Sequence, residues 1–255
     1  YFANQNLDYC LIETGLGGRL DSTNVFTPLL AIITNVSVDH MSFLGNSIEE
    51  ITYEKAGIMK ANVPLITGIT DPKAKNIIQD KAKSLQCDVY YLHEQFSIDE
   101  DEHQTFTFLS NVMTFTNLKL RMIGSHQMTN AAIAIQAFLL LSKMEHFDME
   151  EQHIRKALNQ ASWPGRMEVI KEHPVIMLDG AHNVAGMQAL LSALEKNYPS
   201  SKKHLILSIM KDKEWEKMIS LIDDEFDSIY FTNFEKERAA HGQLLFNESN
   251  HPNKY

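Results

Sequence analysis

Short apolar runs alternate along the first part of the chain with longer stripes of helical period. The runs at residues 29–34, 63–67 and 89–92 are typical of buried strands, and we interpret residues 9–12 in the same way. Apolar positions in residues 74–85 recur at the spacing of one helix face. Strands that alternate with helices predict a mostly parallel sheet covered on both faces.

The pattern changes after the third run. Within residues 96–122, Phe106 and Phe108 alternate with threonines, and Ser110-Asn111 offers a turn, which predicts a β-hairpin. Residues 128–141 are then almost all apolar, so we expect a well-buried helix.

A polar helix that turns Ile154 and Leu158 inward leads to the best candidate for a domain boundary, Trp163-Pro164-Gly165. We therefore predict two α/β domains, residues 1–162 with a mostly parallel sheet and a smaller one at 163–255.

The strand and helix alternation restarts beyond the boundary. We expect a helix between residues 184 and 194, a second around Trp215 to Ile222, and a loose polar tail at 247–255. Strands are predicted at 175–178, 204–210 and 228–232.

Composition limits the classes of function. The chain has 255 residues and a net charge of −10, which disfavours nucleic acid as a partner because phosphate backbones bind basic surfaces. Its two cysteines, Cys10 in a predicted core strand and Cys87, fit a reducing compartment. No apolar segment reaches the ~20 residues that cross a bilayer. We therefore expect a cytoplasmic protein without membrane contact, and the start at Tyr1 suggests an internal portion of a longer chain.

Polar groups that could carry chemistry follow the predicted strands. Glu13 ends the run at 9–12, and a glycine-rich turn at 15–24 comes next. His40 lies just beyond the strand at 29–34. The carboxyl ends of strands are where open α/β sheets place their ligands.

A helix then begins at Ser47, with Glu50 completing a capping box. Its inner face carries Lys55 among isoleucines at positions 48, 51 and 58. Burial of a lysine lowers its pKa, and the neutral amine can act as a nucleophile, as a base or as the partner of CO2 in a carbamate.

Six segments together resemble the folylpolyglutamate synthase and dihydrofolate synthase family of the Mur ligase superfamily. They are ETGLGGRLDSTN at 13–24, VDHMSFLG at 38–45, YEKAGIMK at 53–60, GSHQMTNA at 124–131, WPGRME at 163–168 and LDGAHN at 178–183. The resemblance implies a Mur-ligase-like central domain and a Rossmann-like C-terminal domain, both incomplete. It also implies an ATP-dependent ligase that adds L-glutamate to dihydropteroate or reduced folates through an acyl phosphate.

The resemblance assigns roles to the first three segments. Glu13 and His40 match metal ligands, with Mg2+ as the metal, although a histidine ligand is more typical of zinc or manganese. Lys55 matches a carbamylated lysine, and the alternative is a lysine that extends along its alkyl stem to the surface. Arg19, Leu20 and Asp21 match contacts near the pterin end of the substrate; alternatively, the segment is a tight turn that needs glycine geometry, and Asp21 or Ser22 caps the next element.

The later segments match nucleotide contacts. Asn130, Arg166 and Asp179 correspond to residues that contact ATP, through an amide, a guanidinium and a carboxylate. His182 resembles a catalytic residue near the γ-phosphate and the incoming glutamate; alternatively, it caps the next helix. We expect a monomer whose partners are small molecules.

One expected motif is missing. The family carries a phosphate-binding loop upstream of the Glu13 segment, and no G-x-x-x-x-G-K-[ST] occurs in these 255 residues. We therefore expect the chain alone to be inactive. Two other hypotheses stay open: a non-catalytic module that binds folate or nucleotide, and a cell-wall Mur ligase, against which the LDSTN and EKAGI sequences argue.

Overall fold

The computed structural model describes residues 2–38, 41–101, 105–235 and 237–255. Contacts between residues divide the chain into two compact units, which are described separately. The first unit comprises Tyr1–Asp99, Thr107–Thr116 and Thr129–Ile154, and the second comprises Glu100–Phe106, Asn117–Met128 and Arg155–Tyr255.

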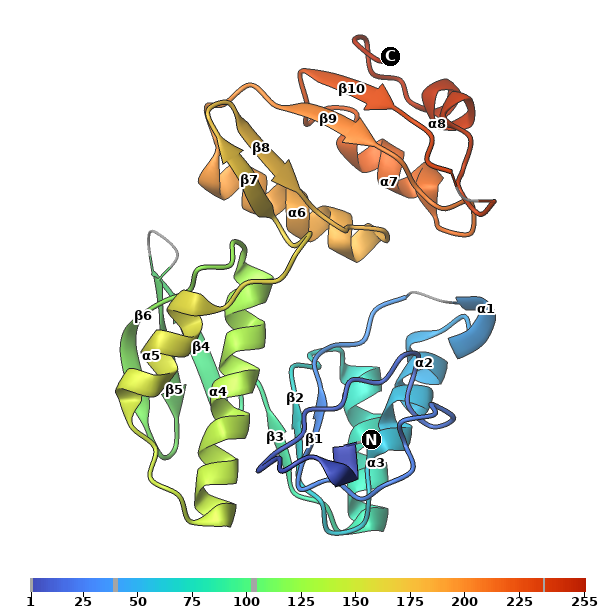
Figure 1. Cartoon of the computed structure of the whole chain (residues 1–255). Coiled ribbons are helices and arrows are strands. Elements are labelled where there is room, and N and C mark those ends of the chain that lie inside the picture. Colours follow the sequence, from blue (N-terminus) through green and yellow to red (C-terminus); the bar gives the residue numbers. More distant parts are fainter. Residues whose placement is uncertain (1, 39–40, 102–104, 236) are drawn as a thin grey trace. The chain divides into compact units, whose positions relative to one another are not determined.

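A parallel three-stranded sheet lies at the centre of the first unit (Figure 1). Its strands are β1 (Ala31–Ile33), β2 (Leu65–Thr67) and β3 (Val89–Tyr91), in that order. Ala31 pairs with Leu65, which in turn pairs with Val89. The three predicted strands are thus confirmed. β2 is buried throughout, as expected for the central strand of a parallel sheet that is covered on both faces.

Helices α1 (Met41–Leu44), α2 (Ile48–Lys55) and α3 (Pro72–Leu85) connect these strands, with a short 3₁₀ turn, η2 (Ala56–Ile58), directly after α2. Another 3₁₀ turn, η1 (Phe2–Asn4), lies near the N-terminus.

Side-chain caps start both longer helices. Ser47 Oγ accepts the N–H of Glu50 at 3.1 Å, while the Glu50 carboxylate accepts the N–H of Asn46 at 2.7 Å. The predicted capping box is therefore present with its return bond moved by one residue. At α3, Asp71 Oδ1 accepts two backbone N–H groups, and Pro72 occupies the first helical position.

The core of the first unit forms between the sheet and the helices. Ile78 on α3 and Leu65 on β2 are both completely buried. Their neighbours in this cluster include Ala31, Ile33, Ala56, Met59, Ile69, Ala74, Ala82 and Tyr91.

A second three-stranded sheet consists of β4 (Phe96–Glu100), β5 (Thr105–Ser110) and β6 (Thr114–Lys119), in that order. Phe108 lies between the rings of Phe96 and Phe115, with centroids 6.2 Å and 6.0 Å away. β5 and β6 form the predicted hairpin. Because side chains alternate between the two faces of a strand, the aromatic residues of this sheet gather on one face.

Two helices follow this sheet, α4 (Ser125–Glu145) and α5 (Glu151–Gln160). α4 is longer than the predicted 128–141, and α5 buries Ile154 and Leu158 as expected. In the part of the chain that the structure describes, neither these helices nor any other combines the length and hydrophobicity of a membrane span.

The second unit contains a hairpin and a parallel pair. β7 (Glu168–Glu172) and β8 (Val175–Leu178) pair antiparallel, whereas β9 (His204–Leu207) and β10 (Ser228–Phe231) pair parallel. The predicted strands in this region are confirmed, with β9 ending earlier than expected. Helices α6 (Val184–Asn197), α7 (Trp215–Ile222) and α8 (Gly242–Glu248) accompany them (Figure 1).

The prediction of a loose tail is wrong. Tyr255 N donates to Ile229 O at 2.9 Å, and Phe231 N donates to Tyr255 O at 2.9 Å, so the tail pairs with β10. Ser249 and His251 are buried although both are polar. Hydrogen bonds to a neighbouring strand satisfy this backbone, which the polar composition of the segment did not reveal.

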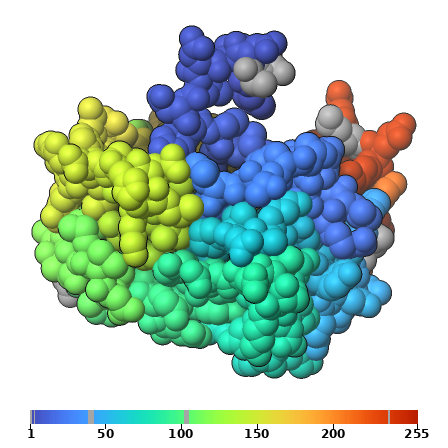
Figure 2. Space-filling view, turned by 90° about the horizontal axis from the view of Figure 1, so that it is seen from below, coloured from blue at the N-terminus to red at the C-terminus, as the bar shows by residue number. Residues whose placement is uncertain are grey.

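The prediction of a buried strand at residues 9–12 is also wrong. These residues form no strand in the structure, Leu11 is 93% exposed, and Cys10 is exposed. An apolar run becomes a strand only where a neighbouring backbone accepts its hydrogen bonds. Tyr9 instead packs edge-on against Phe147, and the N-terminal residues project from the surface (Figure 2).

Candidate functional site

The glycine-rich loop, residues 15–24, docks on the C-terminal end of α2. Arg19 N donates to Glu54 O at 2.8 Å, and its guanidinium binds the Glu54 carboxylate through Nε at 3.1 Å and Nη2 at 2.9 Å. Asn24 Nδ2 donates to Gly57 O at 3.1 Å. Three separate attachments therefore hold the loop against the YEKAGIMK segment.

Glycine is required at both surfaces of this contact. A Cβ on Gly57 would lie 2.2 Å from Arg19 Cα, and one on Gly18 would lie 2.9 Å from Lys55 O. The backbones approach too closely for any side chain. The loop thus lies directly against the backbone of Lys55.

Asp21 holds the loop in shape. Its Oδ2 accepts the N–H of Leu16 at 2.9 Å, and its Oδ1 accepts the N–H and the hydroxyl of Thr23 at 2.9 Å and 2.6 Å. These hydrogen bonds, led by that of the Thr23 hydroxyl, lower the pKa of Asp21 to about 2. The alternative interpretation expected a tight turn, which these bonds form, but the bonds of Asp21 lie within the loop and not at the start of the next element.

The remaining predicted residues of the first unit take several positions. Leu20 is 79% exposed at the outer side of the loop. Lys55 is half-buried at the end of α2, and Asn130 is exposed on α4. Glu13 is exposed just before the loop. Residues 9–12, which precede it, do not form the strand that the sequence predicts.

The second predicted metal ligand, His40, lies outside the described residues. Over the rest of the chain, with its gaps at 39–40, 102–104 and 236, no three His, Cys, Asp or Glu side chains gather as a metal site. Glu13 still offers an exposed carboxylate oxygen, which suits Mg2+ when phosphates and waters complete the coordination.

In the second unit, Asp179 joins the WPGRME and LDGAHN segments. Its Oδ2 accepts the N–H of Met167 at 2.9 Å, and its Oδ1 accepts the N–H of Ala181 at 2.8 Å. Gly180 N donates to Gly165 O at 2.8 Å, and a Cβ on Gly180 would lie 2.7 Å from Arg166 Nη1. Arg166 and Asp179, which are 13 positions apart in the sequence, thus lie on adjoining loops.

His182 and Asn183 complete the second loop. His182 Nδ1 lies 2.8 Å from Gly180 O, and the ring stays exposed. Asn183 Oδ1 accepts the N–H of Gly186 at 2.7 Å, so Asn183, and not His182, caps α6. The alternative interpretation of His182 as the cap is therefore wrong.

His126 lies within electrostatic reach of Arg166 and Asp179, and our sequence prediction missed it. It lies in the first turn of α4, where Gln127 Nε2 approaches its ring Nε2 at 3.1 Å. Partial burial lowers the pKa of His126; the charge of Asp179 opposes this shift and that of Arg166 adds to it. Its position in the GSHQMTNA segment, two residues after Gly124, was the signal that could have identified it.

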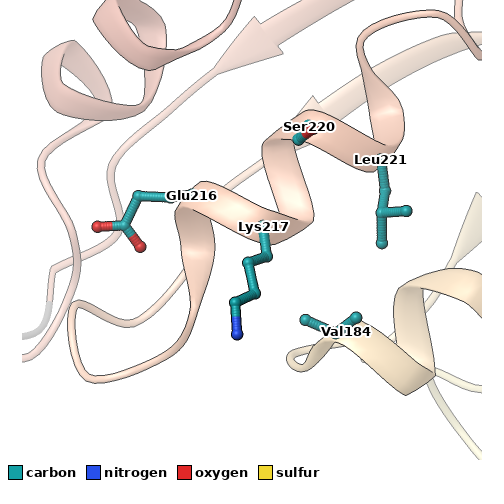
Figure 3. Close-up of a pocket in the computed structure, with 5 residues that line it drawn as sticks. All are labelled: Val184, Glu216, Lys217, Ser220 and Leu221. Carbon is teal, nitrogen blue, oxygen red and sulfur yellow. The ribbon is translucent and has the colours of Figure 1, made fainter.

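A cavity of about 360 Å³ lies elsewhere in the second unit. Figure 3 shows Lys217 and Leu221 extending from α7 toward Val184, the first residue of α6. Its lining is mainly apolar and includes none of the predicted residues. We give more weight to the loops around Asp179, because several polar groups converge there.

Both parts of the chain match one family. Residues 1–138 match the Mur ligase middle domain, and residues 165–254 match the Mur ligase glutamate ligase domain. The chain belongs to the Mur ligase family. Its α/β fold, with parallel and antiparallel strands, accords with this assignment.

Curated relatives of this Mur ligase chain include two from folate metabolism. The dihydrofolate synthase/folylpolyglutamate synthase of Bacillus subtilis is 37% identical over 259 residues, covering 100% of this chain and 60% of the relative. The folylpolyglutamate synthase of Lacticaseibacillus casei is 33% identical, covering 90% and 54%. The chain thus spans little more than half the length of these relatives.

Solved structures give the same result. The "FPGS-AMPPCP-folate complex" superimposes with a TM-score of 0.81 at 32% identity, covering 86% of this chain and 55% of that chain. "E.coli FolC in complex with DHPP and ADP" superimposes with a TM-score of 0.83 at 27% identity, covering 95% and 56%.

Proposed function

We propose that this Mur ligase chain is part of an ATP-dependent ligase that adds L-glutamate to folates. The proposal rests above all on the six quoted segments, which occur in one chain whose curated relatives are named for folylpolyglutamate and dihydrofolate synthesis. The acceptor would be dihydropteroate, a reduced folate, or both. We further propose that residues 1–162 and 163–255 form separate domains of this enzyme.

The reaction requires a carboxylate to be activated as an acyl phosphate and then attacked by the amine of glutamate. Positioning and charge neutralisation carry such phosphoryl transfers. Arg166 would bind phosphate oxygens through its guanidinium fork. Each Asp179 oxygen accepts one backbone N–H and keeps a lone pair, which suits a ribose hydroxyl.

Asn130 and His182 would contribute further contacts. The exposed Asn130 amide can pair with the donor and acceptor edge of adenine. The His182 ring is also exposed, and we assign it to the γ-phosphate and the incoming glutamate.

The Mg2+ site of this proposal would use two predicted ligands. Glu13 would supply a carboxylate ligand and His40 an imidazole, with phosphate oxygens and waters as the remaining ligands. Bound Mg2+ would neutralise phosphate charge. Lys55 lies half-buried beside the loop, and a carbamate on its amine would give an anion that orients water near the cation.

The folate would bind at the glycine-rich loop. Leu20 is the residue of the predicted trio whose side chain projects from the loop, and it would pack against an apolar ring. Arg19 and Asp21 are engaged with Glu54 and with the turn, so they would hold the loop in place for Leu20.

The test is an ADP-release assay on a full-length form that carries a phosphate-binding loop. We expect glutamate-dependent ADP release with dihydropteroate or tetrahydrofolate and none with a UDP-linked cell-wall precursor. Release with the UDP-linked precursor alone would favour the cell-wall ligase. Tight folate binding without ADP release would favour the non-catalytic module.

We also infer a cytoplasmic location. Cys10 and Cys87 are both free thiols, and Cys10 is exposed, which fits a reducing compartment.

A further inference from the structure

Two cationic side chains lie over one exposed tyrosine in the first unit, and the charge of a third, Lys60, acts on one of them. Tyr53 projects from α2 and is 55% exposed. Arg19 Cζ lies 5.7 Å from the centroid of its ring, and Lys81 Nζ, from the adjoining α3, lies 5.8 Å from it. Both distances are within the range of cation–π attraction. Lys60 follows α2 and η2, and we call these four residues the Tyr53 patch.

The patch carries uncompensated positive charge. Arg19 is neutralised by Glu54 at 2.9 Å, but within the described ranges neither Lys60 nor Lys81 forms an ion pair. Burial lowers the pKa of Lys81, and the charges of Lys60 and Arg19 lower it further. The positive charges of Lys60 and Arg19 thus both act on Lys81, and the charge of Glu54 opposes them only in part.

Other lysines of α3 differ in this respect. Lys73 binds Glu49 at 2.9 Å, Lys75 binds Glu94 at 2.8 Å, and Lys83 lies 3.8 Å from Asp80. The whole chain carries a net charge of −10, so acidic partners are plentiful. Among the described residues, two neighbouring lysines without an ion pair in such a chain mark a place where an anion from outside would be stabilised.

We propose that the Tyr53 patch is a binding site for a small oligocarboxylate, which on the proposed function is the γ-linked oligoglutamyl tail of a folate. Arg19 belongs both to the patch and to the loop that carries Leu20, so the patch adjoins the proposed folate site. A tail gains one carboxylate with each added glutamate. Longer-tailed folates therefore bind the patch more tightly than short ones.

The charge that the patch offers to a ligand comes from its two lysines. The Arg19 guanidinium fork is already occupied by the Glu54 carboxylate, so it is not free for bidentate binding of a further anion. Lys60 and Lys81 are point charges on flexible stems that can each attract one carboxylate, and on the proposed function the anion with several spaced carboxylates is the oligoglutamyl tail. A nucleic acid is disfavoured because the chain as a whole is acidic.

The experiment titrates the 255-residue chain with tri-γ-L-glutamate at low salt and follows backbone amide shifts by NMR. We expect shifts at Tyr53, Lys60 and Lys81, and affinity about fivefold weaker in the double variant Lys60→Gln/Lys81→Gln, because each exposed contact adds only modestly. The matched control is Lys73→Gln/Lys83→Gln, which removes the same charge from paired lysines and should bind as the unmodified chain does. Raised salt should weaken binding by the unmodified chain.

Equal affinity in both double variants, or no shifts at the patch, would overturn the inference. Glutamate-dependent ADP release by the full-length enzyme is measured separately. Turnover without tail binding would disprove the binding site at the Tyr53 patch and leave the proposed function standing. Patch-specific tail binding without turnover supports the anion site and removes the proposed function.

Discussion

The Asp21 carboxylate organises the loop that carries the candidate folate contacts. It accepts hydrogen bonds from Leu16 and Thr23, and these bonds favour its charged form. Because its folded-state pKa is lowered to about 2, its contribution to stability is present above its unfolded pKa of about 3.9. That contribution is lost as the pH falls from about 4 through about 2.

This shift predicts a distinctive titration. The Asp21 carboxylate should remain mostly ionised at pH 3, whereas an aspartate in an unfolded peptide is then mostly protonated. The NMR chemical shift of its carboxyl carbon measures this. Asp21→Asn should speed amide exchange at Leu16 and Thr23, with Ser22→Ala as the control. A midpoint near 4 for Asp21 would contradict the hydrogen-bonded turn.

Lys55 makes the sharpest prediction about chemistry. Lys55→Ala in the full-length enzyme should lower turnover about 100-fold, as loss of a group that orients metal ligands does. The fold should persist, because Lys55 is only half-buried. Steady-state ADP release and thermal unfolding measure the two effects, and Lys83→Ala is the control. Near-normal turnover would rule out the carbamate.

The sequence did not predict the contacts that the candidate residues make. It placed Arg19 and Asp21 at a ligand, while in the structure they contact Glu54 and Thr23. Distance along the chain hides such pairings: Arg19 and Glu54 are 35 positions apart. His126 went unnoticed for the same reason, since its neighbours Arg166 and Asp179 come much later.

At the scale of elements, the contact between the glycine-rich loop and the end of α2 connects two family segments. It relies on glycine at Gly57, where Arg19 Cα occupies the position of a side chain. An added side chain at such a contact would force the two backbones apart, and that displacement costs stability.

Gly57→Ala should therefore destabilise the chain by about 1–3 kcal/mol in urea unfolding. Gly15→Ala is the matched control: a Cβ there would meet Asp21 Oδ2 at an ordinary 3.4 Å, so little change is expected. Equal effects of the two substitutions would mean that the loop does not dock closely.

The C-terminal tail makes an independent prediction. His251 is buried, its Nε2 lies 2.8 Å from Phe226 O, and its Nδ1 accepts the N–H of Asn253 at 3.0 Å. Because a carbonyl only accepts, Nε2 carries the hydrogen. His251→Ala should cost about 1–3 kcal/mol by leaving both partners unsatisfied.

Chemical denaturation of His251→Ala beside Asn250→Ala measures this cost. Asn250 is exposed and bonds Asp223 through its backbone, so its substitution should be nearly neutral. A stability of His251→Ala equal to that of the control would mean that the tail is loose after all.

Helices with strong local signals and strands with buried apolar runs were predictable, whereas two segments whose structure depends on the presence of a partner strand were not. The stripe at 74–85 and the cap at Ser47 specify α3 and the start of α2 locally. Residues 9–12 and the tail at 247–255 failed in opposite directions. An apolar run found no strand to pair with, while a polar segment found β10.

For the whole molecule, the family assignment draws on segments from both units. The chain nevertheless spans only 54–60% of the length of the two curated relatives described above. Residues 1–138 and 165–254 match the middle and glutamate ligase domains respectively. The central claim is therefore about the full-length enzyme.

The most direct test of that claim is stoichiometry. The full-length enzyme is incubated with ATP, L-glutamate and dihydropteroate or tetrahydrofolate, and ADP and glutamylated product are quantified together by mass spectrometry. The account predicts one ADP for each glutamyl residue joined through a new amide, and no product without glutamate. ADP released with no glutamylated product, or product formed without ATP, would contradict it.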